Sequence, residues 1–588
     1  MIDPQEDEVL IGIPWRQWTA DAFRQAQESD RPVLLSISAT WCHWCHVMDE
    51  STFRHPEVIR RVSEELVPIR VDTDRRPDIN NRYNLGGWPT TAFLTAQGDI
   101  LTGETFMPVE EFLSVLDEVM GYYRERRSEL EQRLQRRRTR RARISELRHR
   151  LRGNVTPEIV DTVVTALRQA YDAEHGGFGP APKFPLPDTI ELALAAGTAA
   201  QDEALLDMAR TSLMAMAEKG LYDTVDGGFF RYSTTADWTQ PHYEKMLDGN
   251  ARLLSTYLHA AQALDAPLFW QTARGVATYV EANLRDTESG AFAGSADADE
   301  DYYQMREDVR RLRNRPRVDP TIYTDRNAMM VIAFLEAAAT LDEPYYADVA
   351  LQALEAVWGR CFIPGAGMAH VYDGSPHLPG LLADQVWMGQ ALLAAQSHLG
   401  RGDYLQRARA LMDLMASRLA DPDAGGYYDV PFDATALGRL RERLKLLDEN
   451  ALAADLALRL NRLTGDDGDH EAAVGTLEAM APLYRAYRHH AALYALTVSR
   501  FIGPPLHLVL VGDPSAEPSR KLRQAALRIY EPNKLVETVD PNLAPERLAA
   551  LDLPPAPTPT LYARRGRQTS PPVQDPAQLR AAIEAVPA

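Results

Sequence analysis

The sequence predicts a multi-domain protein, in which a small α/β domain is followed by an all-α toroid of six helical hairpins, (α/α)6, and by a small C-terminal α/β segment. Three observations predict this. Short apolar runs alternate with helical patterns near the N-terminus, Ala- and Leu-rich helical sequence with recurring Gly-aromatic loops fills the middle, and the composition changes near residue 500. The predicted segments are the α/β domain at 1–123, an Arg-rich linker helix at 124–155, the toroid at 156–500 and the C-terminal segment at 501–588.

Composition places the chain among ordinary globular proteins. Hydrophobic residues make up 45% of its 588 residues and charged residues 25%. The 83 acidic and 63 basic residues give a net charge of −20, which argues against a nucleic-acid partner, because proteins that bind nucleic acids present a basic surface. Three cysteines are too few for a scaffold held together by disulfides.

Neither a targeting signal nor a membrane partner is expected. The first ten residues are acidic, whereas a secretory signal begins basic and continues with an apolar core. No apolar window approaches the 18 uninterrupted residues that suggest a spanning helix. The expected compartment is therefore the cytoplasm, where thiols stay reduced.

The first domain reads as a small mixed sheet with helices on its faces. Apolar runs predict strands at 32–37, 66–71 and 90–95, and a turn joins the third to a strand at 100–106. A helical pattern follows at 109–123. The resulting order, β-α-β-α-β-β-α, is typical of an α/β fold of this size.

The sharpest chemical motif is the run WCHWCH at 41–46, which follows the first predicted strand. Two cysteines separated by two residues can close a disulfide across the first turn of a helix. A thiolate at that helix N-terminus is stabilised by free backbone N–H groups and by the helix dipole. We therefore assign Cys42 as the attacking thiolate and Cys45 as the resolving thiol. The residues expected to support this redox site are Trp41, His43 and His46.

Two other interpretations of this motif stay open. Cys-x-x-Cys-His is also the spacing of c-type haem attachment, which generally needs an exported, oxidising route. Cys42, His43, Cys45 and His46 could also bind zinc, although adjacent Cys-His pairs rarely point at one ion and no second CxxC is present. We expect no metal and no cofactor.

A second part of the redox site is the run GGWPT at 86–90. Thioredoxin-like folds place a cis proline at the start of a strand that faces the CxxC helix, and Pro89 has that position. We predict that the Trp88–Pro89 peptide bond is cis and faces Cys42. The alternative is an ordinary strand that begins with proline.

Together these motifs resemble a known two-domain family, which includes the spermatogenesis-associated thioredoxin-like protein. The resemblance covers nearly the whole chain. It implies an N-terminal thioredoxin-like domain and a C-terminal domain similar to six-hairpin glycosidases and sugar 2-epimerases. One departure is Ser36, which stands where many thioredoxins hold a buried Asp. The matching motifs are WCHWCHVM at 41–48, VDTDRRPDI at 71–79, GGWP at 86–89, GGFGPAPKFP at 176–185, GGFFRYS at 227–233 and PHYEKML at 241–247.

The segment 124–152 holds 13 Arg against 4 Glu, with leucines roughly at helical spacing. We interpret it as a solvated linker helix, although a partner-binding patch, or docking on the acidic body of the same chain, would also fit. Beyond it, Gly-aromatic loops recur every 50–75 residues, enough for two helices each. Stacked hairpins of this length predict the toroid, with these loops gathered on one rim, and an open superhelix is the competing architecture.

Several acids and aromatics accompany these loops and predict a toroid pocket. In sugar-processing toroids, aromatic rings stack on sugar faces and a carboxylate pair performs acid–base chemistry. Glu244 and Asp297 are the candidate pair. The alternative is structural, with acids that cap helices and aromatics that fill the core. Cys361 is expected to be a buried small hydrophobe. The predicted pocket residues are Tyr232, Trp238, His242, Tyr243, Glu244, Asp248, Asp297, Asp299 and Asp384.

The favoured function is thiol–disulfide exchange at Cys42 and Cys45, fused to a toroid that binds a carbohydrate-like or peptide partner. A sugar-active enzyme of the 2-epimerase or glycosidase class with a regulatory thioredoxin-like domain is the second interpretation. A scaffold in which neither site turns over is the third. The expected partners are a thiol or disulfide protein or a small carbohydrate-like ligand, and the sequence predicts no oligomeric state.

Overall fold

The computed structural model describes residues 12–400 and 402–587. The first ten residues, which carry the expectation of no targeting signal, lie outside the described part. The chain divides into two compact units, Met1–Arg150 with Phe432–Leu444, and Leu151–Pro431 with Lys445–Ala588. No helix within the described residues combines the length and the apolar character that crossing a membrane requires.

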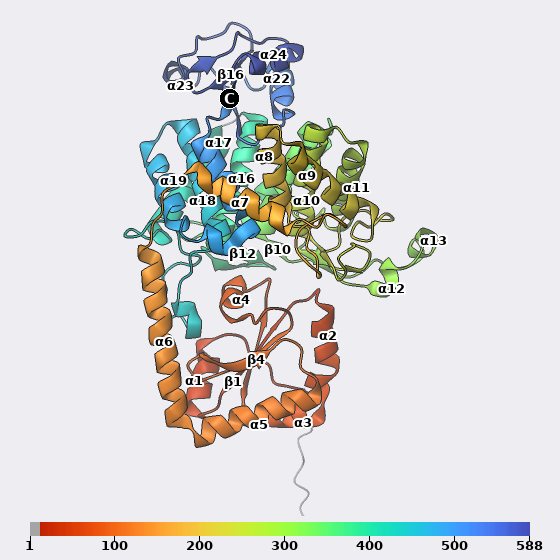
Figure 1. The fold of residues 1–588 in the computed structure, drawn as a ribbon, viewed down its shortest axis with the longest axis vertical. Coiled ribbons are helices and arrows are strands. Elements are labelled where there is room, and N and C mark those ends of the chain that lie inside the picture. The colour runs from red at the N-terminus through yellow and green to blue at the C-terminus, as the bar shows by residue number, and fades with distance from the viewer. Residues whose placement is uncertain (1–11, 401, 588) are drawn as a thin grey trace, which may run out of the picture. The chain divides into compact units, whose positions relative to one another are not determined.

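A four-stranded sheet forms the centre of the first unit (Figure 1). Its order is β2-β1-β3-β4, with β1 (Val33–Ser38), β2 (Val67–Asp72), β3 (Thr90–Leu94) and β4 (Ile100–Glu104). β1 is parallel to β2, whereas β3 is antiparallel to β1 and to β4. The four predicted strands are confirmed to within about two residues.

Helices cover both faces of this sheet, because its central strands are apolar on both sides. Phe23 of α1 and Ile79 of α4 pack on one face, and Met48 of α2, Val58 of α3 and Phe112 of α5 pack on the other. This arrangement confirms the thioredoxin-like fold class. The five helices are α1 (Ala20–Glu28), α2 (His43–Glu50), α3 (Pro56–Glu65), α4 (Pro77–Tyr83) and α5 (Val109–Glu125).

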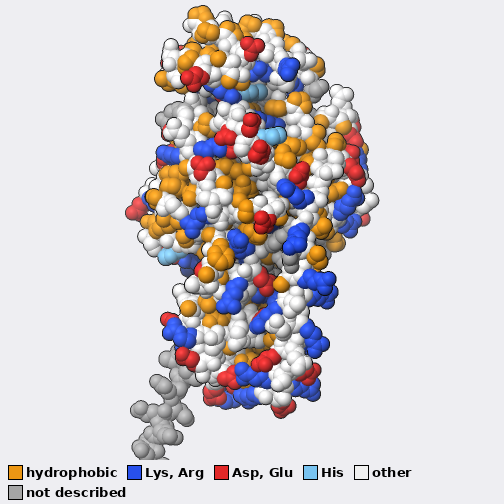
Figure 2. All heavy atoms as spheres, turned by 90° about the vertical axis from the view of Figure 1, so that its left-hand side faces the viewer, with side chains coloured by type: hydrophobic (Ala, Val, Ile, Leu, Met, Phe, Trp, Pro, Cys, Tyr) orange, Lys and Arg blue, Asp and Glu red, His pale blue; other side chains and the backbone are white. Residues whose placement is uncertain are grey.

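Most of the Arg-rich segment forms one helix, α6 (Arg127–Arg150), which belongs to the first unit. The predicted helix at 124–155 is therefore too long at both ends, because Arg124 and Glu125 end α5 and the residues after Arg150 are not helical. Leu130 and Leu134 are buried, and Arg138 pairs with the buried carboxylate of Asp99. Figure 2 turns the side of α6 to the viewer and shows basic side chains scattered among acidic and uncharged ones. The helix is therefore fixed to its own unit by ion pairs and by a short apolar stripe.

A segment from far along the sequence completes the first unit. Phe432–Leu444 packs on α4, and two of its leucines extend the core around Trp18. The buried Tyr83 hydroxyl donates to the Gly98 carbonyl (2.7 Å) and accepts from the Arg439 amide (2.7 Å). The sequence prediction assigns this segment to the toroid, whereas its contacts lie within the thioredoxin-like unit.

Tyr83→Phe is expected to lower the free energy of unfolding of the first unit by about 1–3 kcal/mol, because it leaves a buried carbonyl and a half-buried amide without their partner. Urea denaturation of the full chain, followed by tryptophan fluorescence, measures the change. Tyr487→Phe is the control, because Tyr487 is 41% exposed, and it should change the value by less than about 0.5 kcal/mol. Equal effects of the two substitutions would show that the segment is not held through Tyr83.

Six helices form a closed inner ring in the second unit. Each packs on the next, and the last, α21, returns to the first, α8. This closure confirms the toroid and rules out the open superhelix. The inner helices are α8 (Pro187–Ala200), α10 (Leu247–Leu264), α14 (Thr324–Thr340), α16 (Leu382–Leu399), α18 (Leu447–Thr464) and α21 (Ala492–Ile502).

Outer helices surround this ring. Five of them pair as hairpins with the inner helices that precede them, and α7 closes the circle against α21. Because every outer helix leads back through a long loop to the start of the next inner helix, these loops return to one rim. The predicted convergence of the Gly-aromatic loops on one end is confirmed. The outer helices are α7 (Pro157–Ala170), α9 (Glu203–Glu218), α11 (Pro267–Asn283), α15 (Tyr345–Cys361), α17 (Gly402–Arg418) and α19 (Asp467–Met480).

The Gly-aromatic loops share one internal architecture. In the loop that starts at Asp223, the Gly227 amide donates to the Asp223 carbonyl (2.9 Å), and Lys245 donates to the Asp223 carboxylate and to the Gly227 carbonyl (2.7 Å each). Gly228 has a φ of +77°, and a Cβ there would lie 2.6 Å from the Tyr279 ring. Lys183 and Lys445 fill the same place in the loops that start at Asp172 and Asp421.

A buried amide in the first turn of an inner helix holds the aromatic of three of these loops. Asn250 accepts from the Phe229 amide (2.7 Å) and donates to its carbonyl (3.0 Å), and Asn327 and Asn450 bind Phe292 and Tyr427 in the same way. These aromatic side chains lie in the core. The interpretation of the aromatics after Gly-Gly as core residues is therefore the correct one at these loops.

The C-terminal segment is a small α/β domain within the second unit. Its sheet has the order β15-β14-β16-β17, with β14 parallel to β15 and antiparallel to β16. The predicted α/β character of this segment agrees with the structure, in which the segment begins with strand β14 and helix α22. The elements are β14 (Leu506–Val511), α22 (Glu517–Leu527), β15 (Lys534–Val539), α23 (Pro545–Ala550), β16 (Thr560–Arg565), β17 (Gln568–Thr569) and α24 (Leu579–Glu584).

Candidate functional site

The two cysteines of the CxxC motif form a disulfide at the start of α2. Cys42 is the N-cap residue, and its sulfur accepts from the Cys45 amide at 3.2 Å. Backbone N–H groups and the positive end of the helix dipole therefore point at Cys42, as expected for the more acidic thiol. Ser36 is buried in β1, so a hydroxyl occupies the position where many thioredoxins hold a carboxyl.

Two tryptophans and their polar partners build the wall beside this disulfide. The Trp41 indole donates to the Asp74 carboxylate (2.6 Å) and meets Trp88 edge to face, with ring centroids 5.7 Å apart. The Trp88 indole donates to the Asn80 side chain (3.1 Å). The Trp88–Pro89 peptide is cis, as predicted. Asp74 and Asn80 fix the two indoles and were not predicted as site residues.

The outer edge of the redox site is exposed. His43 and His46 lie at the surface, and Trp44 is 49% exposed and meets Phe106 at 5.4 Å. A sulfur that is almost covered, next to an accessible indole, suits a thiol that reacts with a docked partner rather than with bulk solvent.

At the toroid rim, the structure brings three predicted residues together. His242 shares a hydrogen bond with Glu244 (2.6 Å) and stacks on Tyr232, with ring centroids 5.0 Å apart. Phe184, which is 40% exposed, extends the stack beyond Tyr232 at 4.8 Å. A buried carboxylate below a row of stacked rings is an arrangement that can hold a sugar face.

The candidate acid–base pair lies on neighbouring short strands, β7 (Lys245–Met246) and β8 (Ser295–Ala296). Lys245 pairs with Ala296 in antiparallel register, so Glu244 and Asp297 are the next residues at that end of the ladder. The strand pairing therefore brings the backbones of the two acids together, as a catalytic pair requires.

A second group of acids lies in the first turns of the inner helices. The Asp384 carboxylate accepts from the Asp325 amide (3.2 Å) and shares a hydrogen bond with His370 (2.9 Å), and Asp188 pairs with Arg252. Since these contacts join several helices, the helix starts gather at one rim. The acids of this group are Asp188, Asp248, Asp325, Asp384, Asp448 and Glu449.

Crowding and burial change the protonation of this group. Burial raises the pKa of Asp384 to about 6, although the neighbouring His370 opposes the shift. Burial and the Asp188 carboxylate raise the pKa of Asp448 to about 7. Burial, followed by the charge of Asp429 and other carboxylates, raises the pKa of Glu449 well above its usual value. Groups with pKa values raised in this way can donate a proton near neutral pH.

Two acids of this group, together with His370, have the geometry of a metal site. Ligand atoms of Asp325, His370 and Asp384 all lie within 4.8 Å of one another. A carboxylate–imidazole set of this kind can bind a divalent cation. The expectation of no metal stays a prediction.

Three predicted pocket residues have structural roles instead. Trp238 is wholly buried, and its indole donates to the Gly176 carbonyl (3.3 Å), so its placement on the pocket was wrong. The Asp299 carboxylate caps α12 (Glu300–Tyr303) by accepting from the Tyr302 amide. Tyr243 packs between other rings at the base of the rim.

Some residues deeper in the inner ring were not predicted as site residues. Arg252 pairs with Asp188 and lies over the Trp387 ring, with its guanidinium 5.1 Å from the ring centroid. In the sequence alone, Asp188 and Asp448 look like ordinary acids in the first turn of a helix, since acids at a helix N-terminus interact favourably with the helix dipole. The signal that could have found them is their recurrence at the start of successive inner helices.

Asp448→Asn is expected to raise the thermal midpoint at pH 8 and to leave it nearly unchanged at pH 4. The folded-state pKa lies above the ordinary value of 3.8. Between pH 3.8 and about pH 7 the folded chain therefore binds more protons than the unfolded chain. As pH rises through this range, the charge that forms on the buried Asp448 carboxylate increasingly opposes folding. Calorimetry at both pH values measures the difference. The exposed Asp161→Asn serves as control, and the same pH pattern there would refute the assignment.

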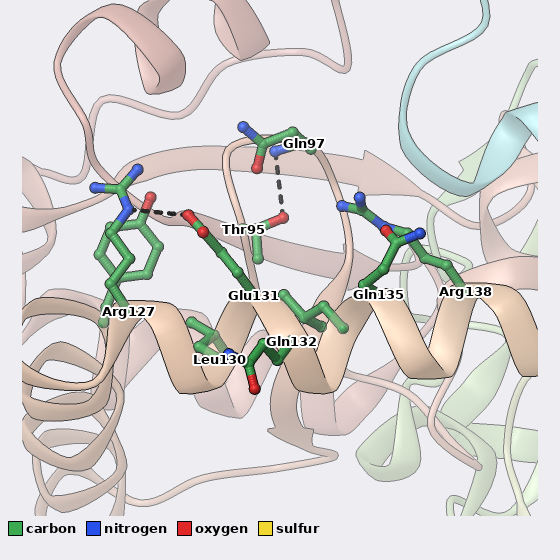
Figure 3. A pocket seen from close by; sticks show the side chains of 10 residues that line it. Thr95, Gln97, Arg127, Leu130, Glu131, Gln132, Gln135 and Arg138 are labelled. Atoms are coloured by element: carbon green, nitrogen blue, oxygen red, sulfur yellow. Dashed lines mark hydrogen bonds and ion pairs between the residues drawn. The ribbon is translucent and has the colours of Figure 1, made fainter.

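A separate cavity of about 550 Å³ lies along α6 in the first unit. Figure 3 shows Leu130 and Gln132 on the helix and Thr95 and Gln97 on the neighbouring turn. Its charged groups already have partners, because Arg127 pairs with Glu131. None of the cysteines lines this cavity, so we do not assign it to the redox site.

Comparisons with known proteins agree with this two-part organisation. A family model described as Thioredox_DsbH, protein of unknown function, DUF255, matches residues 8–140. Spermatogenesis-associated protein 20 of Mus musculus is 25% identical over 711 residues, which cover 97% of this chain and 89% of that protein. The resemblance to the two-domain family is confirmed. The Homo sapiens protein of the same name is 32% identical over 314 residues, or 49% of this chain, and this match spans only 39% of that protein's length.

A solved structure is also similar to the toroid part of the chain. It is the cellobiose 2-epimerase from Spirochaeta thermophila DSM 6192, which is 16% identical, with a TM-score of 0.49. The match covers 59% of this chain and 95% of that chain. At this distance the likeness assigns no activity, and the chemistry must be argued from the residues themselves.

Proposed function

We propose that the chain catalyses thiol–disulfide exchange at Cys42 and Cys45. The observation that carries this proposal is the closed Cys42–Cys45 pair, with Cys42 capping the N-terminus of α2. A dithiol in that position has one thiol whose anion the helix stabilises and a second thiol one turn away. The proposed partner is a protein disulfide, and the proposed compartment is the cytoplasm.

In the reducing direction, the Cys42 thiolate attacks one sulfur of the partner disulfide and expels the other as a thiolate. The Cys45 thiolate then attacks the Cys42 sulfur, closes the intramolecular disulfide and releases the second partner thiol. The partner gains two electrons and the chain loses two. A dithiol protein or a low-molecular-weight thiol must reduce the chain again.

Equilibration of the full chain with glutathione buffers of graded potential tests this proposal. Mass spectrometry after rapid alkylation should show one two-electron transition between the dithiol and disulfide forms. The reduced chain should also cleave a model peptide disulfide faster than free glutathione at equal thiol concentration. Absence of both the transition and the cleavage would exclude a redox function.

A carbohydrate-active toroid is the second candidate function. The favouring observation is the stack of Phe184, Tyr232 and His242 above the buried Glu244. Aromatic rings can cover a sugar face, while the acids with raised pKa values supply proton transfer. Calorimetric titration with monosaccharides, with Glu244→Gln as the matched variant, tests this function. If no sugar binds and no disulfide exchange occurs, the scaffold interpretation remains.

A further inference from the structure

A pocket of about 730 Å³ lies between the C-terminal α/β domain and the toroid, both within the second unit. Its size is typical of small-molecule sites. Helix α22 forms one wall, and the end of α16 and the turn after α14 form the other. The charged side chains that line it are Arg520, Lys521, Arg523, Arg528 and Arg580, against Asp342 and Glu517.

Only two of these five cations have a carboxylate partner in the pocket. Lys521 pairs with Glu517 (2.8 Å), and Arg528 pairs with Asp342 (2.9 Å). Among the residues that the structure describes, Arg520, Arg523 and Arg580 have no acidic partner. An excess of positive charge in a chain of net charge −20 marks a local site for an anion.

Arg523 is the strongest indication. It is 6% exposed, and its guanidinium donates to the carbonyls of His398 (2.7 Å) and Pro514 (3.2 and 3.3 Å). Burial and the nearby Arg520 lower its pKa to about 10. A buried cation without a counter-charge is unfavourable, and a bound anion would supply that charge.

The uncharged walls indicate the rest of the ligand. Leu399, Leu527, Ile529 and Leu579 line the pocket beside the cations. No Phe, Tyr or Trp is among the described lining residues, so the pocket lacks the large rings that would stack on a nucleobase. An aliphatic body would cover the leucine and isoleucine side chains and bury their apolar surface.

We propose that this pocket binds a phosphate monoester with an aliphatic body. Guanidinium groups match phosphate oxygens in a bidentate geometry, and a phosphate monoester carries close to two negative charges at neutral pH. Three arginines without acidic partners suit such a dianion better than a single carboxylate. The C-terminal domain thereby gains a ligand-binding role that is independent of the redox site.

Calorimetric titration of the full chain with hexyl phosphate, inorganic phosphate and hexanol tests the proposal. Hexyl phosphate should bind at least about tenfold more tightly than inorganic phosphate, and hexanol should not bind. Flotation with phosphatidylcholine vesicles, with and without phosphatidic acid, separates a lipid source from a soluble one. Either source supports the shared chemistry. Equal affinities for hexyl and inorganic phosphate would overturn the aliphatic part of the proposal.

The double substitution Arg520→Gln and Arg580→Gln should weaken hexyl phosphate binding tenfold or more. Both side chains are exposed, so the fold should be retained, and the thermal midpoint checks this. Arg567→Gln is the control, because Arg567 is exposed on the same domain but does not line the pocket. The site would be overturned if hexyl phosphate did not bind at millimolar concentration. It would also be overturned if Arg567→Gln weakened the binding of hexyl phosphate as much, per charge removed, as the double substitution does.

Discussion

Cys42→Ser is expected to abolish disulfide exchange, whereas Cys45→Ser is expected to trap mixed disulfides with partner proteins. Cys42 caps α2 and accepts from the Cys45 amide, so its thiolate is the stabilised one. Without Cys42 no mixed disulfide forms, and without Cys45 the mixed disulfide is not resolved. Rates of cleavage of a model peptide disulfide, and non-reducing electrophoresis of the Cys45→Ser protein, measure the two outcomes.

Cys361→Ser is the matched control for this pair of variants. Cys361 is fully buried, and burial raises the pKa of its thiol to about 11. Its replacement should leave the exchange rate unchanged. Alkylation of the reduced chain at mildly acidic pH should label Cys42 first, and preferential labelling of Cys45 or Cys361 would contradict the assignment of the attacking thiol.

The parts of the fold that depend on local pattern could be predicted from the sequence. The apolar run that became β1, followed at once by the CxxC motif, indicated the redox helix, and Pro89 indicated its facing strand. The recurring Gly-aromatic loops indicated the hairpins. In each case the signal lies within a few residues of the element that it predicts, so no knowledge of distant contacts was needed.

The acid group at the toroid rim could not be assembled in this way. Asp188, Asp325 and Asp448 lie far apart in the sequence, and each alone looks like an acid that stabilises a helix dipole. Only the closed ring of inner helices brings their first turns together. The prediction that Trp238 lines the pocket was wrong for the same reason, because the burial of Trp238 beneath Gly177 depends on how two loops pack.

The distribution of lysine could also have indicated the structure of these loops. The chain has 63 basic residues but only six lysines, and three of these fill the Asp-Gly-Gly loops. A compact ammonium reaches the carboxylate and the glycine carbonyl together, whereas a planar guanidinium is larger and rigid. Lysine in an otherwise arginine-rich chain therefore indicated positions with a strict geometric demand.

Lys445→Met is expected to lower the free energy of unfolding of the toroid by about 3–5 kcal/mol, the usual cost of removing one partner from a buried ion pair. Lys445 donates to the Asp421 carboxylate (2.7 Å) and to the Gly425 carbonyl (2.6 Å), and the pair is nearly covered. The substitution leaves Asp421 with a tyrosine hydroxyl and backbone amides, but no other cation among the described residues. Differential scanning calorimetry of the full chain measures the loss.

Lys245→Met should cost less than Lys445→Met, although Lys245 is more deeply buried. Its partner Asp223 also pairs with Arg310 (2.8 Å), which remains after the substitution and still neutralises the carboxylate. Lys219→Met, at an exposed helix end, should change the unfolding free energy by less than about 0.5 kcal/mol. If Lys245→Met proved the more damaging of the two, the lysines would act through packing against aromatic rings rather than through compensation of the loop aspartates.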